Sequence, residues 1–210
     1  GAKDFDWSVC FPVPAMDERA IRWDLNYFKY CFLKGTGIEF SEPRLEDDFD
    51  HLVQVITAQP ADAFLYRDCQ SRNIMIKDGK PYFIDFQGGR RGPTQYDVVS
   101  LLWQAKANLS PALREQLIAE YLDELEKIEI TNHQSPITNR ASWLSALPHF
   151  VLLRTLQVLG AYGYRGYFER KQHFLESIPL ALKNLSEVMA ELKDEYPYLY
   201  AISNDLLFLV

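Results

Sequence analysis

Two acidic side chains and one amide stand close together between residues 66 and 87. The segment YRDCQSRN, residues 66–73, holds Asp68 and Asn73, and the segment IDFQ, residues 84–87, holds Asp85. Mg²⁺ prefers oxygen ligands and is usually held by one or two protein groups together with substrate phosphates. Asn73 and Asp85 therefore form a candidate magnesium pair.

Asp68 is a candidate for the base of a phosphoryl transfer. That reaction asks the protein mainly to position the reactants and to neutralise charge. An Asp five residues before a metal-binding Asn, followed by a second Asp in a D-F-x context, is the order found in protein kinases. We expect Asp68 to hold the acceptor hydroxyl and to take its proton.

The elements that position these residues are two short strands joined by a tight turn. Residues 74–76 and 82–84 are short apolar runs that predict strands, and Asp78-Gly79 between them is the signal of a tight hairpin turn. Residues 63–66 form a further predicted strand. Residues 87–93, rich in Gly and Arg, are predicted to be a loop.

The remainder of the chain is predicted to be helical, which gives an α+β, predominantly α-helical fold in a single domain over residues 1–210. Apolar residues recur at helical spacing on both sides of the hairpin, and Gly, Pro and N-cap residues mark the ends of the segments. The predicted helices span residues 17–34, 45–59, 95–105, 110–127, 139–147, 148–162, 164–173 and 179–193.

Composition excludes several classes of protein. A net charge of −7 argues against a broad nucleic-acid surface, because such binding requires many phosphate-neutralising cations. The apolar region at residues 150–160 is flanked by Pro148 and contains Arg154, so no membrane span is predicted. Three cysteines without C-x-x-C spacing favour a reduced, cytoplasmic location.

These motifs resemble those of the aminoglycoside phosphotransferase and choline kinase-like family, whose fold is related to that of protein kinases. The run YFIDFQ at residues 82–87 and the run RGPTQYDVVSLL at residues 91–102 are most similar to a bacterial group that phosphorylates the anomeric hydroxyl of N-acetylmuramate and N-acetylglucosamine for cell-wall recycling. The resemblance implies ATP as co-substrate and Mg²⁺ as cofactor, with Asp68 as base and Asn73 and Asp85 as metal ligands. It also implies a small hydroxylated acceptor, most simply a sugar.

The sequence departs from that family in two respects. Tyr66 stands where the family usually has His. No Gly-rich phosphate loop or strand Lys precedes the catalytic segment, so the chain is expected to be the C-terminal lobe alone and to bind ATP weakly. The nucleotide-binding lobe is expected upstream, where a fused nucleotidyltransferase domain is a further candidate.

Other residues are candidates for support and for acceptor binding. Asp97, in an otherwise apolar helix, is expected to brace the loop at residues 66–73, called the catalytic loop below, because a buried carboxylate needs partners. Arg67 and Arg72 offer forked donors to phosphate, although scattered loop ion pairs explain them about as well. The resemblance places a further set on helices that line the acceptor pocket, where core packing is the competing explanation: Trp23, Asp24, Asn26, Tyr27 and Arg154.

Two alternative functions remain open at this stage. A pseudoenzyme or binding module that keeps the fold without transferring phosphate would account for Tyr66 and for the missing lobe. An aminoglycoside-modifying kinase would suit the acidic surface, because its substrate is polycationic, although net charge bears on association rather than on pocket identity.

Overall fold

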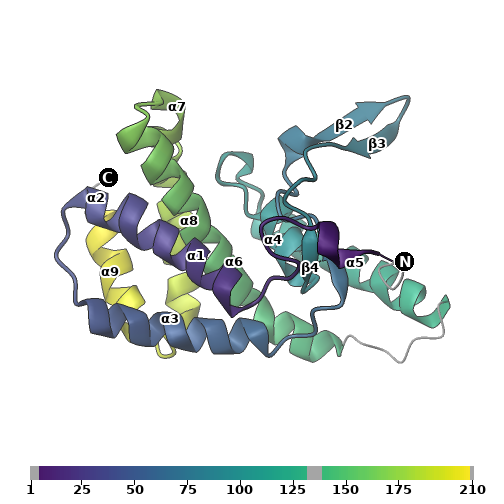
Figure 1. The fold of residues 1–210 in the computed structure, drawn as a ribbon, viewed down its shortest axis with the longest axis horizontal. Coiled ribbons are helices and arrows are strands. Elements are labelled where there is room, and N and C mark those ends of the chain that lie inside the picture. Colours follow the sequence, from purple (N-terminus) through teal and green to yellow (C-terminus); the bar gives the residue numbers. More distant parts are fainter. Residues whose placement is uncertain (1–4, 132–138, 209–210) are drawn as a thin grey trace.

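The structure is a computed structural model that describes residues 5–131 and 139–208. A helical body carries two small antiparallel sheets, and the β2–β3 hairpin projects from that body (Figure 1). The predicted fold class, mostly helical with small strands, is confirmed at this level.

The hairpin forms where the sequence predicts it. Strand β2 (Ile74–Lys77) pairs with β3 (Lys80–Phe83) in antiparallel register. Asp78 and Gly79 join them with φ values of 51° and 73°. Two consecutive residues with positive φ give the turn a twist that matches the strands, which is why Asp-Gly is favoured there.

The second sheet corrects the prediction of a loop at residues 87–93. Strand β1 (Ala63–Leu65) pairs antiparallel with β4 (Arg90–Gly92), and Ala15 bridges to Arg91 on the other edge of β4. Three residues rich in Arg and Gly carry little strand signal. Gly92 packs so closely on Leu65 that a Cβ there would lie 2.9 Å from Leu65 Cδ2, so tertiary packing decides this strand.

The N-terminal helices follow the predicted boundaries closely. Helix α1 (Glu18–Phe28) is capped by Asp17, whose carboxylate accepts from the amide of Ala20. It continues through a π-helical turn, Lys29–Leu33, into the short α2 (Lys34–Thr36), and Gly37 ends it with φ of 79°. Helix α3 (Glu42–Thr57) then runs back along the body.

After strand β4 the described part of the chain consists of helices and the turns that join them. Helix α4 (Gln95–Leu102) leads through a 3₁₀ turn, Ala105–Ala107, to α5 (Pro111–Thr131). The remaining helices are α6 (Arg140–Gly163), which ends in a π-helical turn at Tyr164–Phe168, and α7 (Gln172–Leu175), α8 (Ile178–Leu192) and α9 (Pro197–Leu207).

Helix α6 corrects the prediction of a break at Pro148. The helix continues through this proline, although a proline in a helix interior removes one backbone hydrogen bond. The carbonyl that loses its ordinary donor belongs to Leu144, a residue that is 42% exposed. Burial of Leu147 and Phe150 on either side stabilises the continuous helix.

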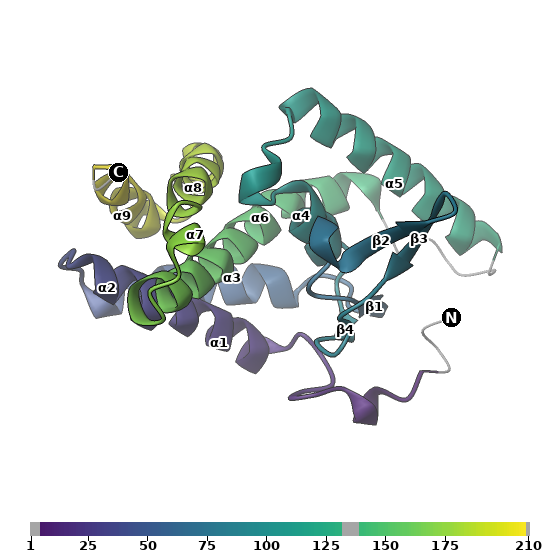
Figure 2. The ribbon, with the colours of Figure 1, turned by 90° about the horizontal axis from the view of Figure 1, so that it is seen from above.

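The core is built around α6, which runs between α1 and α8 (Figure 2). Gly160 and Gly163 allow α1 and the following π turn to cross α6 closely. A Cβ on Gly160 would lie 2.8 Å from the backbone nitrogen of Phe28, and one on Gly163 would overlap the carbonyl oxygen of Cys31.

The continuous stretch Arg140–Phe168 is long and apolar enough to cross a membrane by length and composition, contrary to the prediction that no segment qualifies. Of its most apolar window, 67% is buried inside the protein. The core helix of a soluble protein passes the same test, and the packing of α6 against α1, α4 and α8 fits that explanation.

Candidate active site

The catalytic loop and the hairpin are tied together by three successive hydrogen bonds. The Tyr66 hydroxyl donates to the carbonyl of Ile84, and the amide of Ile84 donates to the carbonyl of Asn73 at 3.0 Å. The side-chain Nδ2 of Asn73 then donates to the carbonyl of Asp68 at 3.0 Å. Asp68, Asn73 and the residue next to Asp85 therefore belong to one hydrogen-bonded unit.

Asn73 and Asp85 differ in their surroundings. Asn73 is 5% exposed, and its amide nitrogen is held by the loop, which leaves the amide oxygen as its free end. Asp85 is exposed and adopts φ of 70°, a left-handed conformation in which Asp is one of the better-tolerated residues. Gln87 donates to one of its carboxylate oxygens.

This donor set fits magnesium bound together with phosphate. One amide oxygen and one carboxylate are oxygen ligands of the kind that Mg²⁺ prefers, and they leave most coordination positions for water and phosphate. Over residues 5–131 and 139–208, no three His, Cys, Asp or Glu side chains gather into a metal cage.

Asp68 is held by a cation from the centre of the core. Arg154 of α6 donates from Nη2 to Oδ1 of Asp68 at 3.2 Å, and Gln70 donates to the same oxygen at 3.1 Å. Burial alone would raise the pKa of Asp68, but the charge and hydrogen bond of Arg154 outweigh burial and hold that pKa below its usual value. The carboxylate is therefore ionised at neutral pH.

Asp97 binds the backbone of the loop. Its two carboxylate oxygens accept from the amides of Tyr66 and Arg67, the latter at 2.8 Å. Burial raises the pKa of Asp97 to about 6, with these two amides opposing the rise. The contacts are those expected of a residue that braces the catalytic loop.

Arg67 links the loop to α1. It adopts φ of 71°, and its Nη2 donates to Asp24 at 2.7 Å. The Ser100 hydroxyl donates to the Arg67 carbonyl at 3.2 Å. Asp24 is 6% exposed, and burial raises its pKa against the nearby arginines. This interior position fits an anchor for the loop, and the predicted contact of Asp24 with an acceptor stays a prediction.

The other predicted acceptor residues are spread over accessible and buried positions. Trp23 is 46% exposed, whereas Asn26 and Tyr27 are partly buried on the same helix. The ring of Tyr27 lies 6.2 Å from that of Tyr164. Arg72 is exposed at the edge of the loop. Arg154 is buried and faces Asp68, so any contact with an acceptor would be made beside the base.

Sequence reasoning missed several polar residues that complete the site. Gln104 accepts from both the amide and the hydroxyl of Ser71, at 3.1 and 2.9 Å, and Gln157 accepts from Arg154 at 2.7 Å. Ser100 could have been found, because it is a polar residue in an apolar helical run. The two glutamines carry no such signal, since their spacing from the loop depends on the tertiary fold.

Cys69, next to the candidate base, is not activated. Burial, followed by the charge of Asp97, raises the pKa of its thiol to about 11. Cys10, Cys31 and Cys69 are all free thiols in the structure. Because the thiolate is the reactive form, nucleophilic chemistry at Cys69 is disfavoured.

The segment that matches a known protein family contains the catalytic loop, the β2–β3 hairpin, helices α3 and α4 and almost all of α5. Residues 32–130 match the phosphotransferase enzyme family. The predicted resemblance is thereby confirmed, and Asp68, Asn73, Asp85 and Asp97 all lie inside the matched segment. Trp23 to Tyr27 and Arg154 lie outside it.

Curated relatives extend the similarity over most of the chain. The chain is 26% identical over 200 residues to an N-acetylmuramate/N-acetylglucosamine kinase of Neisseria meningitidis. The matched region covers 92% of this chain and 58% of the relative. The chain is 24% identical over 183 residues to the kinase of the same name from Pseudomonas putida, covering 85% of this chain and 52% of the relative. The chain thus spans about half the length of these relatives.

Proposed function

We propose that this chain supplies the catalytic and acceptor-binding lobe of an ATP-dependent kinase that phosphorylates a hydroxyl of a cell-wall amino sugar. The observation that carries the proposal is the hydrogen-bonded unit that joins Asp68, Asn73 and the hairpin residue before Asp85. The names of the relatives support an amino sugar of the N-acetylmuramate and N-acetylglucosamine type as acceptor.

In this proposal Asp68 orients the acceptor hydroxyl and takes its proton. The sugar oxygen bonds to the γ-phosphorus of ATP, the bond from that phosphorus to the bridging oxygen breaks, and ADP leaves. Because Arg154 keeps Asp68 ionised, the carboxylate is ready to accept a hydrogen bond and then the proton at neutral pH.

Asn73 and Asp85 would hold the magnesium ion, which when bound neutralises charge on the phosphates. Tyr66 and Asp97 keep the loop in place from opposite sides, through Ile84 and through two backbone amides. Tyr66 therefore supplies a hydrogen bond at the position where the resembled family usually has His, which favours a working loop over a degenerate one.

A nucleotide-binding lobe contributed by another part of the protein completes the proposal. The hairpin presents exposed apolar side chains that such a lobe and the adenine ring could cover, with Ile76, Tyr82 and Phe83 being 69%, 52% and 53% exposed. The activity is accordingly proposed for the protein that contains this chain, not for the lobe alone.

The test is an assay of that protein at full length with ATP and a panel of N-acetylmuramate, N-acetylglucosamine and kanamycin. We expect phosphate transfer to at least one amino sugar, and a loss of about 10²-fold or more in kcat for Asp68→Asn and for Asp85→Asn. Asp78→Asn is the matched control, because it lies in the turn of the same hairpin, where Asn also tolerates positive φ.

The possible outcomes separate the candidate functions. Transfer to kanamycin alone would replace the sugar acceptor with an aminoglycoside. Nucleotide binding that requires magnesium, without transfer to any acceptor, would favour a ligand-binding module. Turnover by Asp68→Asn at the rate of Asp78→Asn would overturn the assignment of the base.

A further inference from the structure

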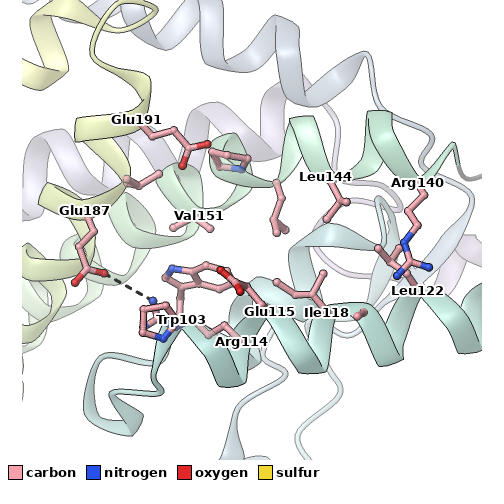
Figure 3. Close-up of a pocket in the computed structure, with 15 residues that line it drawn as sticks. Trp103, Arg114, Glu115, Ile118, Leu122, Arg140, Leu144, Val151, Glu187 and Glu191 are labelled. Atoms are coloured by element: carbon pink, nitrogen blue, oxygen red, sulfur yellow. Dashed lines mark ion pairs between the residues drawn. The ribbon is translucent and has the colours of Figure 1, made fainter.

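A cavity of about 530 Å³ opens between three helices on a part of the molecule outside the catalytic loop and the hairpin. Its walls are one face each of α5, α6 and α8, closed at one end by Trp103 (Figure 3). The apolar part of the α6 wall is formed by Leu144, Leu147, Pro148 and Val151, spaced as one helical face. The volume lies in the range of small-molecule sites.

One buried polar group in this cavity lacks a partner. Arg114 is 7% exposed, its guanidinium lies 4.8 Å from the centre of the Trp103 ring, and its Nη1 is 3.7 Å from Glu187. Within the described residues, its buried Nε has no hydrogen-bond partner. Leaving such a donor unsatisfied costs about 1–3 kcal/mol, so a small turn of the Arg114 side chain that brings Nε to a ligand's acceptor would be favoured.

The charges at the rim select against anions. Three carboxylates line the cavity, those of Glu115, Glu187 and Glu191. The two cations that line it are already engaged, because Arg114 faces Glu187 and Arg140 contacts Asp123 at 2.6 Å. A negatively charged ligand would meet a net negative rim, whereas an uncharged molecule would not.

Trp103 connects the cavity to the catalytic loop. Its carbonyl accepts from Asn184 of α8 at 3.1 Å, which fixes it between α8 and α4. The next residue, Gln104, accepts from both the amide and the hydroxyl of Ser71. A ligand packed on Trp103 would therefore contact the direct neighbour of Gln104, which binds the catalytic loop at Ser71.

We propose that this cavity binds a small, uncharged, largely apolar molecule that carries a carbonyl-type acceptor, and that its occupancy stabilises the catalytic loop through Trp103 and Gln104. Arg114 Nε donates to the ligand's acceptor, and the faces of α5 and α6 enclose its apolar body. The site lies outside the proposed reaction and does not depend on it.

The binding test uses the uncharged naphthalene ketone prodan, whose emission shifts to the blue in an apolar site. We expect a saturable blue shift that Ala119→Trp abolishes, because Ala119 lines the cavity, and that Ala112→Trp leaves intact, because Ala112 is exposed on the same helix. Arg114→Met should weaken prodan binding by about two- to tenfold through loss of one hydrogen bond. Thermal unfolding verifies that each variant is folded.

A matched pair of competitors tests the charge argument. Uncharged 2-acetylnaphthalene should displace prodan, and the similarly sized anion 2-naphthoate should do so at least about tenfold less well. Identical prodan titrations for Ala119→Trp and Ala112→Trp, or equal displacement by the two competitors, would overturn the proposed site. A signal that Ile76→Ser removes instead would assign the binding to the hairpin.

The coupling test uses hydrogen exchange of the peptide that contains Ser71. Saturating prodan should slow exchange of the Ser71 amide in the wild-type chain and should have no effect on it in Gln104→Ala, which still binds prodan. Unchanged exchange in the wild-type chain would refute the coupling to the loop and leave a binding site without that role.

Discussion

Arg154, in the middle of α6, donates to the carboxylate of Asp68, which lies 86 residues earlier in the chain, at 3.2 Å. The two side chains differ in exposure, since that of Arg154 is 6% exposed and that of Asp68 is 46% exposed. The cation is thus delivered from the core to a base that remains accessible. This geometry lets the protein fix the charge state of Asp68 without closing it off from an acceptor.

Arg154→Met should raise the pKa of Asp68, because the largest contribution opposing burial is the charge of Arg154. Carbon NMR of the Asp68 carboxyl, assigned with Asp68→Asn, measures this. The pair lowers the folded-state pKa, so its contribution to stability is present above the unfolded pKa of about 4 and is lost as the pH falls through the folded value.

The same variant should lower the free energy of unfolding by about 1–2 kcal/mol at pH 7, less than for a fully enclosed pair because Asp68 can be hydrated. Arg154→Lys is the control that keeps the charge, and it should retain most of the pKa depression. An unaltered Asp68 titration in Arg154→Met would contradict the assigned role of the guanidinium.

The raised pKa of Asp97 predicts a pH dependence of stability opposite in sign to that expected from Asp68. Burial raises its folded pKa from 3.8 to about 6, so the folded state binds the proton more tightly, and this contribution to stability is lost as the pH rises from about 4 to about 6. Urea unfolding of wild type and Asp97→Asn at several pH values measures the difference. Relative to the variant, the wild type should lose up to about 3 kcal/mol across that window.

A flat stability difference between pH 4 and pH 7 would mean that Asp97 does not titrate in this range. The comparison is made as a difference because other buried acids, such as Asp24 and Asp48, also have raised pKa values. Their contributions are common to both proteins and cancel.

Tyr66→Phe should loosen the attachment of the hairpin to the loop, because the Tyr66 hydroxyl donates to the Ile84 carbonyl. Loss of one such hydrogen bond costs about 0.5–1.5 kcal/mol, so the Ile84 amide should exchange with solvent several-fold faster. Tyr82→Phe, on an exposed tyrosine of β3, serves as the control and should leave the exchange of Ile84 unaffected. Equal rates in the two variants would count against this bridge.

Gly163→Ala should destabilise the fold by about 1–3 kcal/mol or more, because its methyl group would overlap the backbone at Cys31 and neither helix can move without disturbing the core. Gly79→Ala provides the comparison: it has open space but φ of 73°, so it should cost only about 1 kcal/mol through backbone strain. Chemical denaturation of both variants checks the order, and a smaller loss for Gly163→Ala would be inconsistent with the close crossing.

Local signals in the sequence predicted the β2–β3 hairpin well. Asp78-Gly79 encodes its turn through backbone preference alone, so its structure needs no distant contact. Strand β4 and the unbroken α6 could not be predicted in this way. Arg90 to Gly92 becomes a strand because β1 offers a partner, and Pro148 stays in a helix because neighbouring residues are buried.

The candidate site likewise combines features that local sequence indicates with features that only the tertiary fold creates. Spacing in the sequence could indicate the candidate base and metal ligands, but the tertiary fold brings Arg154 to Asp68 and Gln104 to Ser71. The metal and acceptor roles of the individual residues stay predictions, to be tested by the substitutions above.

The β2–β3 hairpin has a practical consequence for handling the protein. It is a sheet of only two strands, whose outer edges carry unpaired backbone groups beside exposed Met75 and Ile76. Such edges are templates for pairing with a second chain. The isolated lobe is therefore expected to self-associate at high concentration, and Ile76→Lys on the edge strand β2 should keep it monodisperse for solution measurements.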